Sequence, residues 1–167
     1  RRLTHRCVAV SEDIRERLQR YEGLDAGEIE VIYNGVDLQA YTPQGEHDRP
    51  QDHARILMVE GRLGGGAESG LENGVALARQ LSAEWTAPVE LMVVGNVPPA
   101  LKEKITRMDV PVIWKGVVRR EDIPGVDRSA HVLLSTDINA ACPNSVIEAM
   151  ACGLPVVGYD TGALREL

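Results

Sequence analysis

Apolar runs alternate with amphipathic stretches over most of the chain after residue 55. The runs are apolar at nearly every position and lie at residues 56–61, 89–95, 110–116, 131–136 and 154–159. Between the first two, residues 71–85 repeat apolar side chains along one helical face. Further helices are expected at residues 99–108, 120–128 and 144–152. Because apolar strands that alternate with helices are typical of a parallel sheet covered on both faces, the pattern predicts an α/β fold with a doubly wound, Rossmann-like parallel sheet.

The beginning of the chain shows the same two signals on a smaller scale. Residues 6–11 and 29–37 predict strands, and Ser11 is the expected N-cap of the charged helix that follows it. The second strand is expected to stop at an Asn34-Gly35 turn. After this turn, residues 37–54 are polar, contain proline and lack periodicity, which predicts a linker. The length of 167 residues fits one domain plus a piece of another.

Composition and charge narrow the functional classes. The chain has 18 Lys and Arg against 25 Asp and Glu, for a net charge of −7, which argues against nucleic acid as a partner. Its three cysteines form no CxxC pair, which argues against a disulfide framework or a zinc site and favours a reducing, cytoplasmic compartment. No run approaches the ~20 apolar residues of a membrane span. These observations leave a cytoplasmic protein that binds a small molecule as the expectation.

The glycine-rich segment after residue 61 fails two nucleotide-binding motifs. A P-loop needs a lysine after its last glycine, but Ala67 and Leu71 stand at the two positions where it would be. A dinucleotide fingerprint that starts at Gly64 needs a further glycine where Ser69 stands, which disfavours a Rossmann dehydrogenase. The segment is either a flexible loop or a loop whose backbone approaches a ligand, with Arg62 as an anion contact.

The stretch "ACPNSVIEAMACGLPVVGYD" (141–160) places one carboxylate, Glu148, among small and apolar side chains. Asn144 or Ser145 is expected to cap a helix that Gly153 closes, so Glu148 lies early in a helix at the carboxyl end of a strand. As a structural residue, Glu148 would complement the helix dipole by about 0.3–1 kcal/mol. Its apolar neighbours predict partial burial, however, and a buried carboxylate needs partners such as ribose hydroxyls. Free amides at residues 143–146 would bind a diphosphate.

Six blocks of the chain, in this order, resemble glycosyltransferase family 4. They read "AVSEDIRERL", "IEVIYNGVDLQAYTP", "EGRL", "LMVVG", "KGVV" and "NSVIEAMACGLPVVGYDTGALREL". Members of that family are retaining transferases with the GT-B fold. The resemblance implies that residues 1–36 end an N-terminal domain, that residues 37–54 link the domains, and that residues 55–167 are most of the C-terminal, donor-binding half. The acceptor-binding N-terminal domain and a C-terminal tail are then expected outside this sequence.

The resemblance also implies roles for individual residues. Glu148 matches the second glutamate of the family's E-x7-E motif, which holds the ribose, and Arg62 matches the arginine that contacts the diphosphate. Residues 143–146 match the loop and helix start that cradle the diphosphate and sugar, and residues 115–117 match the base-binding segment. The predicted donor-binding set is Arg62, Gly64, Lys115, Gly116, Val117, Asn139, Pro143, Asn144, Ser145, Val146 and Glu148. No metal or other cofactor is expected, because basic side chains and a helix N-terminus supply the positive charge for the leaving diphosphate.

Two departures from the family pattern affect the predicted chemistry. Ala140 stands eight residues before Glu148, where the family has a glutamate that holds the donor sugar, and Asn139 or Asp137 is the candidate to replace it. The lysine that usually follows the arginine is also missing, since residues 64–74 contain no basic side chain. Loss of one cation beside a leaving diphosphate would cost several kcal/mol of transition-state stabilisation, so no residue is assigned as catalytic.

The sequence therefore predicts transfer of a sugar, with retention, from a UDP- or GDP-linked donor to a glycan, lipid or small-molecule acceptor. The expected location is the cytoplasm, with room for peripheral contact with the inner face of the membrane through parts outside this sequence. The main alternative is a non-catalytic or degenerate nucleotide-sugar-binding module. A sugar-nucleotide epimerase of the same fold is a further alternative, which the "EAMACGLPVV" block disfavours.

Overall fold

A five-stranded parallel sheet forms the centre of the computed structural model, which describes residues 6–62, 70–108 and 110–167. Its strands are β3 (Ala54–Arg62), β4 (Val89–Asn96), β5 (Val112–Gly116), β6 (Val132–Ser135) and β7 (Val156–Gly158). Each lies within two residues of the strand predicted from the sequence. The spatial order is β5-β4-β3-β6-β7, so the chain builds outward from β3 to β5, returns, and builds outward from β6 to β7. The point of reversal lies between β3 and β6, where sheets of this kind bind ligands.

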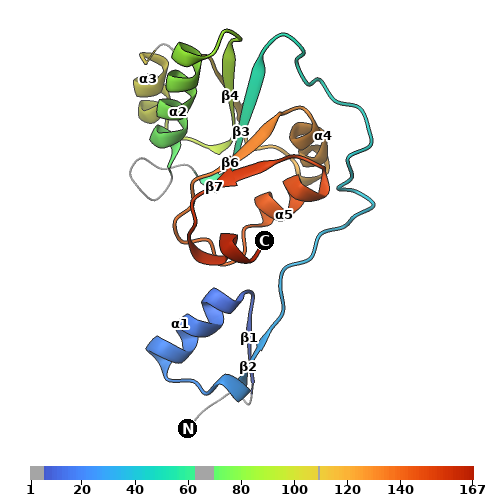
Figure 1. The fold of residues 1–167 in the computed structure, drawn as a ribbon, viewed down its shortest axis with the longest axis vertical. Coiled ribbons are helices and arrows are strands. Elements are labelled where there is room, and N and C mark those ends of the chain that lie inside the picture. The colour runs from blue at the N-terminus through green and yellow to red at the C-terminus, as the bar shows by residue number, and fades with distance from the viewer. Residues whose placement is uncertain (1–5, 63–69, 109) are drawn as a thin grey trace.

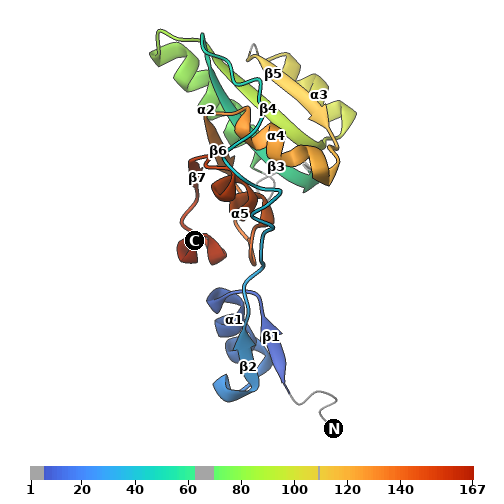
Figure 2. The same cartoon turned by 90° about the vertical axis from the view of Figure 1, so that its right-hand side faces the viewer.

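Helices cover both faces of this sheet (Figures 1 and 2). One face carries α2 (Leu71–Glu84) and α3 (Pro99–Thr106), and the other carries α4 (Ile123–Arg128) and α5 (Asn144–Ala151). A short 3-10 helix, η2 (Arg120–Asp122), leads into α4, and another, η3 (Gly162–Glu166), ends the chain. The architecture confirms the predicted doubly wound α/β fold. No helix in the described part of the chain is long and apolar enough to cross a membrane.

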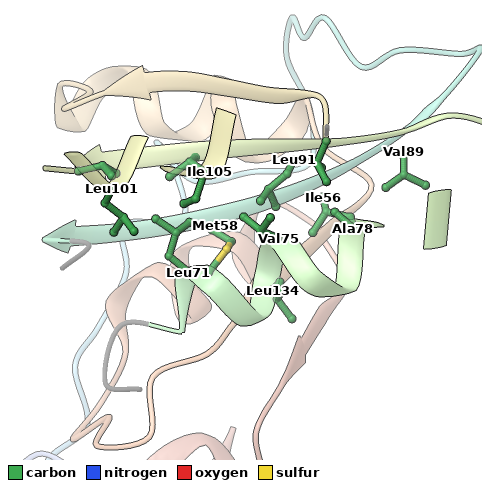
Figure 3. Close-up of a cluster of buried hydrophobic side chains, with 13 residues drawn as sticks. Ile56, Met58, Leu71, Val75, Ala78, Val89, Leu91, Leu101, Ile105 and Leu134 are labelled. Carbon is green, nitrogen blue, oxygen red and sulfur yellow. The ribbon is translucent and has the colours of Figure 1, made fainter. Parts of the chain in front are cut away.

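The central strand β3 separates two hydrophobic clusters. Because successive side chains of a strand point to opposite faces, Ile56 and Met58 join the cluster under α2 and α3, whereas Leu57 joins the cluster under α4 and α5. Figure 3 shows the first cluster, where Val75 of α2 lies against the strand side chains. This alternation explains why the strand is apolar at nearly every position.

A smaller unit, formed by β1 (Cys7–Ala9), α1 (Glu12–Glu22), η1 (Ala26–Glu28) and β2 (Ile29–Val31), precedes the sheet. Ser11 is the N-cap of α1, as predicted, and its hydroxyl accepts a hydrogen bond from the Ile14 amide. The predicted strand at 29–37 was too long. The strand β1, with which β2 pairs, ends at Ala9, so the parallel pairing of β2 ends at the facing residue, Val31.

Residues 32–53 connect this unit to β3 without a helix or strand. They are nevertheless fixed on α4: Arg128 Nη1 donates to the Thr42 carbonyl over 3.1 Å, and Arg49 Nε donates to the Arg128 carbonyl over 3.0 Å. Tyr41 is only 3% exposed and belongs to the hydrophobic cluster of that face. The segment is therefore packed along the sheet domain. The domain boundaries at residues 37 and 54 remain a prediction.

The start of α5 differs from the sequence prediction. Its N-cap is Pro143, which makes no side-chain cap, and Asn144 is already the first helical residue. The expected cap by Asn144 or Ser145 was wrong, because both residues already lie inside the helix, and Asn144 Oδ1 instead accepts from Asn34 Nδ2 over 2.8 Å. The other end is as predicted: Gly153 has a φ of +73° and its amide donates to the Met150 carbonyl.

Candidate functional site

A cleft of about 570 Å³ lies where α5, α4 and two connecting segments meet. Its lining residues are Asn34, Gly35, Tyr41, Val118, Arg120, Ile123, Asn144 and Glu148. They come from the segment between β2 and β3, the turn and short helix η2 after β5, and the two helices of one sheet face. Residues distant in the sequence thus form one polar cavity around the helix that carries Glu148.

Glu148 reaches this cleft because of its position on α5. Val146 and Ala149, three residues apart, are buried against the sheet. Glu148 lies on the flank of that apolar face, where it is partly buried and still faces the cavity. The predicted partial burial is confirmed, and a carboxylate in this place can accept hydrogen bonds from a ligand in the cleft.

The first turn of α5 leaves fewer amides free than the sequence suggested. Pro143 has no N–H, and its carbonyl accepts from the Val146 and Ile147 amides over 3.1 and 3.3 Å. Of the four residues 144–147, only Asn144 and Ser145 have an amide without a partner among the described residues. Together with the helix dipole, these two N–H groups make the cleft end of α5 attractive to an anion.

Arg120 and Tyr41 bring further polar groups to the cleft. The Tyr41 hydroxyl is buried and has no hydrogen-bond partner among the described residues. Burial raises the pKa of Tyr41, the nearby Arg120 guanidinium opposes this shift, and the Glu148 charge adds to it. Both charged groups therefore lie close to the hydroxyl.

A second carboxylate lies behind the cleft and is fully buried. Asp127 of α4 is 1% exposed, and neither of its carboxylate oxygens has a hydrogen-bond partner among the described residues. Burial, followed by the negative charge of Glu148, raises the pKa of Asp127 to about 7, while the neighbouring Cys152 thiol and the Arg128 charge oppose this shift. Burial and the charge of Asp127 in turn raise the pKa of the Cys152 thiol to about 11. Cys152 is thus a buried, protonated side chain, as expected for a structural cysteine.

Two carboxylates lie at the reversal point of the sheet. Glu60 lies near the end of β3, and Asp137 follows the neighbouring strand β6. Burial, and then the charge of Asp137, raise the pKa of Glu60 to about 7. Asp137 Oδ1 accepts from the Asn139 amide over 2.8 Å, and Ala140 beyond it is 3% exposed, with its carbonyl held by the Ala163 amide. The position of the missing glutamate is therefore packed inside the protein.

The structure brings only part of the predicted donor-binding set to the cleft. Asn144 and Glu148 line it, while Pro143 and Ser145 lie in the same helix start. Val146 is buried in the core, and Asn139 is exposed near the reversal point. Gly64 and the side chain of Arg62 lie outside the described residues.

The predicted base-binding segment, residues 115–117, lies next to the cleft without lining it. Lys115 borders a separate cavity with His47 and Asp122, and the Val117 side chain is 78% exposed. Gly116 ends β5 with a φ of +67°, a conformation that suits glycine, and the turn that it starts carries Val118 into the cleft.

Sequence reasoning missed several lining residues. Asn34 and Gly35 were recognised as a turn and as part of a family-like block but not as site residues, and Arg120 lies in the polar stretch "RRED", which carries no signal of its own. Tyr41 gave a weak signal, as an aromatic residue within an otherwise polar segment. His131, by contrast, has a structural role, since its Nδ1 accepts from the Arg55 amide over 3.0 Å. No group of side chains suited to hold a metal ion occurs among the described residues.

Comparison with known proteins identifies the family. Residues 54–167 match the family model described as "Glycosyl transferases group 1", and residues 1–40 match the model described as "Glycosyltransferase Family 4". The chain belongs to the group 1 glycosyltransferases. The predicted resemblance is confirmed, and the described fold is the C-terminal half of a GT-B fold.

Two curated relatives and one solved structure illustrate the family. The chain is 30% identical, over 59% of its length and 25% of the relative's, to the 2-deoxystreptamine N-acetyl-D-glucosaminyltransferase of Streptomyces fradiae. It is 27% identical, over 89% of its length and 40% of the relative's, to the GDP-mannose-dependent α-(1-6)-phosphatidylinositol dimannoside mannosyltransferase of Mycobacterium tuberculosis. HepE of Anabaena, solved in complex with UDP and glucose, matches 98% of this chain and 46% of its own with a TM-score of 0.76 at 19% identity. This family member thus spans less than half the length of these proteins.

Proposed function

We propose that this chain is the donor-binding half of a hexosyltransferase that moves a sugar, with retention, from a nucleoside diphosphate sugar to an acceptor. The observation that carries the proposal is the juxtaposition of Glu148 with the start of α5 in one cleft. The family membership supports the reaction class, and the acceptor is assigned to a domain outside this sequence. A cytoplasmic location is part of the proposal.

Each polar group of the cleft has a counterpart in such a donor. The Glu148 carboxylate accepts hydrogen bonds from two ribose hydroxyls, and the amides of Asn144 and Ser145 donate to the diphosphate. Arg120 adds positive charge to the same cavity. A helix N-terminus and arginines can stabilise the leaving diphosphate without a metal ion.

Ala140 stands where the family has a glutamate that holds the donor sugar, and carboxylates at the reversal point of the sheet can take over that role. Glu60 and Asp137 lie where the sheet order reverses, and Asn139 adds an amide beside them. With a pKa of about 7, Glu60 can donate as well as accept a hydrogen bond near neutral pH. We assign these side chains to the hydroxyls of the donor sugar.

Calorimetric titration of the chain with UDP, GDP and their sugars tests the proposal and identifies the base. Glu148→Ala is expected to weaken binding about tenfold or more, because hydrogen bonds to a charged group contribute about 1.5–3 kcal/mol. Glu22→Ala, at the far end of α1, serves as the control and is expected to bind like the unsubstituted chain. If neither nucleotide binds, or if Glu148→Ala changes nothing, the assignment of the cleft is wrong.

A non-catalytic nucleotide-sugar-binding module is the second candidate. Ala140 and the lack of a basic side chain in residues 64–74 favour it. Turnover distinguishes the two: the full-length protein releases UDP or GDP from the sugar donor if it is a transferase, and only binds the donor if it is a module.

A further inference from the structure

The Glu166 carboxylate, near the end of the chain, contacts the helix of the N-terminal unit. Its Oε2 accepts from the Glu12 amide and its Oε1 from the Asp13 amide, both over 2.8 Å. Oε2 also accepts from the Tyr33 hydroxyl over 2.6 Å. Glu166 belongs to η3, the short helix beside the C-terminus in Figure 1, and η3 contacts α1. One side chain therefore connects η3 to both α1 and the segment after β2.

These contacts complete the N-terminal cap of α1. The first amides of a helix have no acceptor within it, and Ser11 satisfies only that of Ile14. Glu166 supplies the acceptors for the two preceding amides from more than 150 residues away. Burial alone would raise the pKa of Glu166, but the Tyr33 hydroxyl, the two amides and the Arg15 charge together lower it. The carboxylate is thus ionised when it caps the helix.

The neighbour of Tyr33 makes a second contact with the sheet domain. Asn34 Nδ2 donates to Asn144 Oδ1 over 2.8 Å and to the Cys142 carbonyl over 3.3 Å, both at the start of α5. Two adjacent residues of one extended segment therefore contact η3 and α5. Asn34 and Gly35 also form a wall of the cleft that contains Glu148.

We propose that Glu166 is a positioning residue for the nucleotide: by holding α1 and Tyr33, it places Asn34 and Gly35 against the start of α5 and so shapes the donor cleft. Without the Glu166 carboxylate, only the two hydrogen bonds of Asn34 Nδ2 hold Asn34 and Gly35 against the start of α5. The cleft then widens beside Glu148. This inference rests on the proposed function, because it assumes that the cleft takes a nucleoside diphosphate.

Hydrogen exchange and calorimetry test the inference together. Glu166→Ala is expected to speed exchange of the Glu12 and Asp13 amides and to weaken UDP or GDP binding about fivefold or more, a typical coupling between distant sites. Glu166→Gln keeps one acceptor oxygen and should lose less affinity. Since coupling is reciprocal, bound nucleotide should also slow exchange of the same two amides in the unsubstituted chain. A residue that only stabilised the fold would show no more slowing at these two amides than at core amides such as that of Leu91, because a bound ligand protects every amide that exchanges through global unfolding.

The outcomes separate this inference from the proposed function. If the unsubstituted chain binds neither nucleotide, both are wrong. If it binds one and Glu166→Ala binds it equally well, or if nucleotide leaves the exchange of the two amides unchanged, only the role of Glu166 is wrong. Glu22→Ala, at the opposite end of α1, is the matched control and should change neither measurement.

Discussion

The two faces of the parallel sheet differ in kind although the same strands supply both. The face under α2 and α3 is covered by an aliphatic cluster, with Leu91 of β4 fully buried at its centre (Figure 3). The face under α4 and α5 contains Tyr41, Cys152 and the unpartnered carboxylate of Asp127, and it opens into the cleft. The face under α2 and α3 is therefore apolar throughout, whereas the face under α4 and α5 contains buried polar groups next to the cleft.

The face under α4 and α5 contains destabilising groups that the face under α2 and α3 does not. A buried polar group without a hydrogen bond lowers stability by about 1–3 kcal/mol, and Asp127 and Tyr41 both present such groups. Because these groups adjoin Glu148, we expect substitutions on the two faces to separate stability from binding. The following experiments test this difference.

The largest effect is expected on the aliphatic face. Leu91→Ala should lower the free energy of unfolding by about 2–5 kcal/mol, because it leaves a cavity among fully buried side chains. Urea denaturation measures the loss, and Leu38→Ala, whose side chain is 70% exposed, is the matched control. Under conditions where the variant is folded, its nucleotide affinity should equal that of the unsubstituted chain. A weakened affinity would mean that the two faces are not independent.

An intermediate, pH-dependent effect is expected at Asp127. Its pKa is raised to about 7 in the folded state, whereas the unfolded carboxyl titrates near 4, so the unfolded state releases the proton first as pH rises. Stability should therefore fall between about pH 4 and pH 7. Asp127→Asn should reduce this fall, as measured by urea denaturation at pH 5 and pH 8.

Glu60, whose pKa is also raised to about 7, contributes to the same pH range. Glu60→Gln should remove a further part of the pH dependence, and the double variant should lose more of this fall than either single variant. If the stability of Asp127→Asn falls with pH as steeply as that of the unsubstituted chain, the Asp127 carboxylate is ionised in the folded protein and must be hydrogen-bonded there.

The smallest effect is expected at Tyr41, and in opposite directions for stability and binding. Tyr41→Phe removes a buried hydroxyl that has no partner in the described structure, so stability should stay unchanged or rise by up to about 1 kcal/mol. Nucleotide affinity should fall severalfold, because the hydroxyl adjoins Glu148 and Arg120 in the cleft. Equal affinity in calorimetry would assign Tyr41 to packing alone.

Local signals made much of the fold predictable. Apolar runs and turn residues placed all the strands of the main sheet, and the αL glycine at 153 marked the end of α5 correctly. The errors occurred where a partner decides the outcome. β2 is short because β1 ends early, and Asn144 does not cap α5 but lies inside the helix with its side chain bonded to Asn34.

The site was predictable only where its residues lie in one continuous stretch. Glu148 and the start of α5 could be identified because helix position and burial follow from neighbouring residues. Arg120 and Tyr41 could not, because no local pattern shows which distant segments will meet across a cleft. Lys115 borders a different cavity on the face of β5 opposite to Trp114, which packs with the cluster under α2 and α3, and the sequence does not reveal which segments form that cavity.

The sequence by itself determined the parallel α/β architecture and the placement of one carboxylate at the end of a strand, because periodicity and turn chemistry act over a few residues. The tertiary structure alone decided which segments enclose that carboxylate and how Glu166 reaches α1 from the other end of the chain. Such long-range contacts depend on how the whole sheet packs, and packing is a property of the folded chain rather than of any stretch within it.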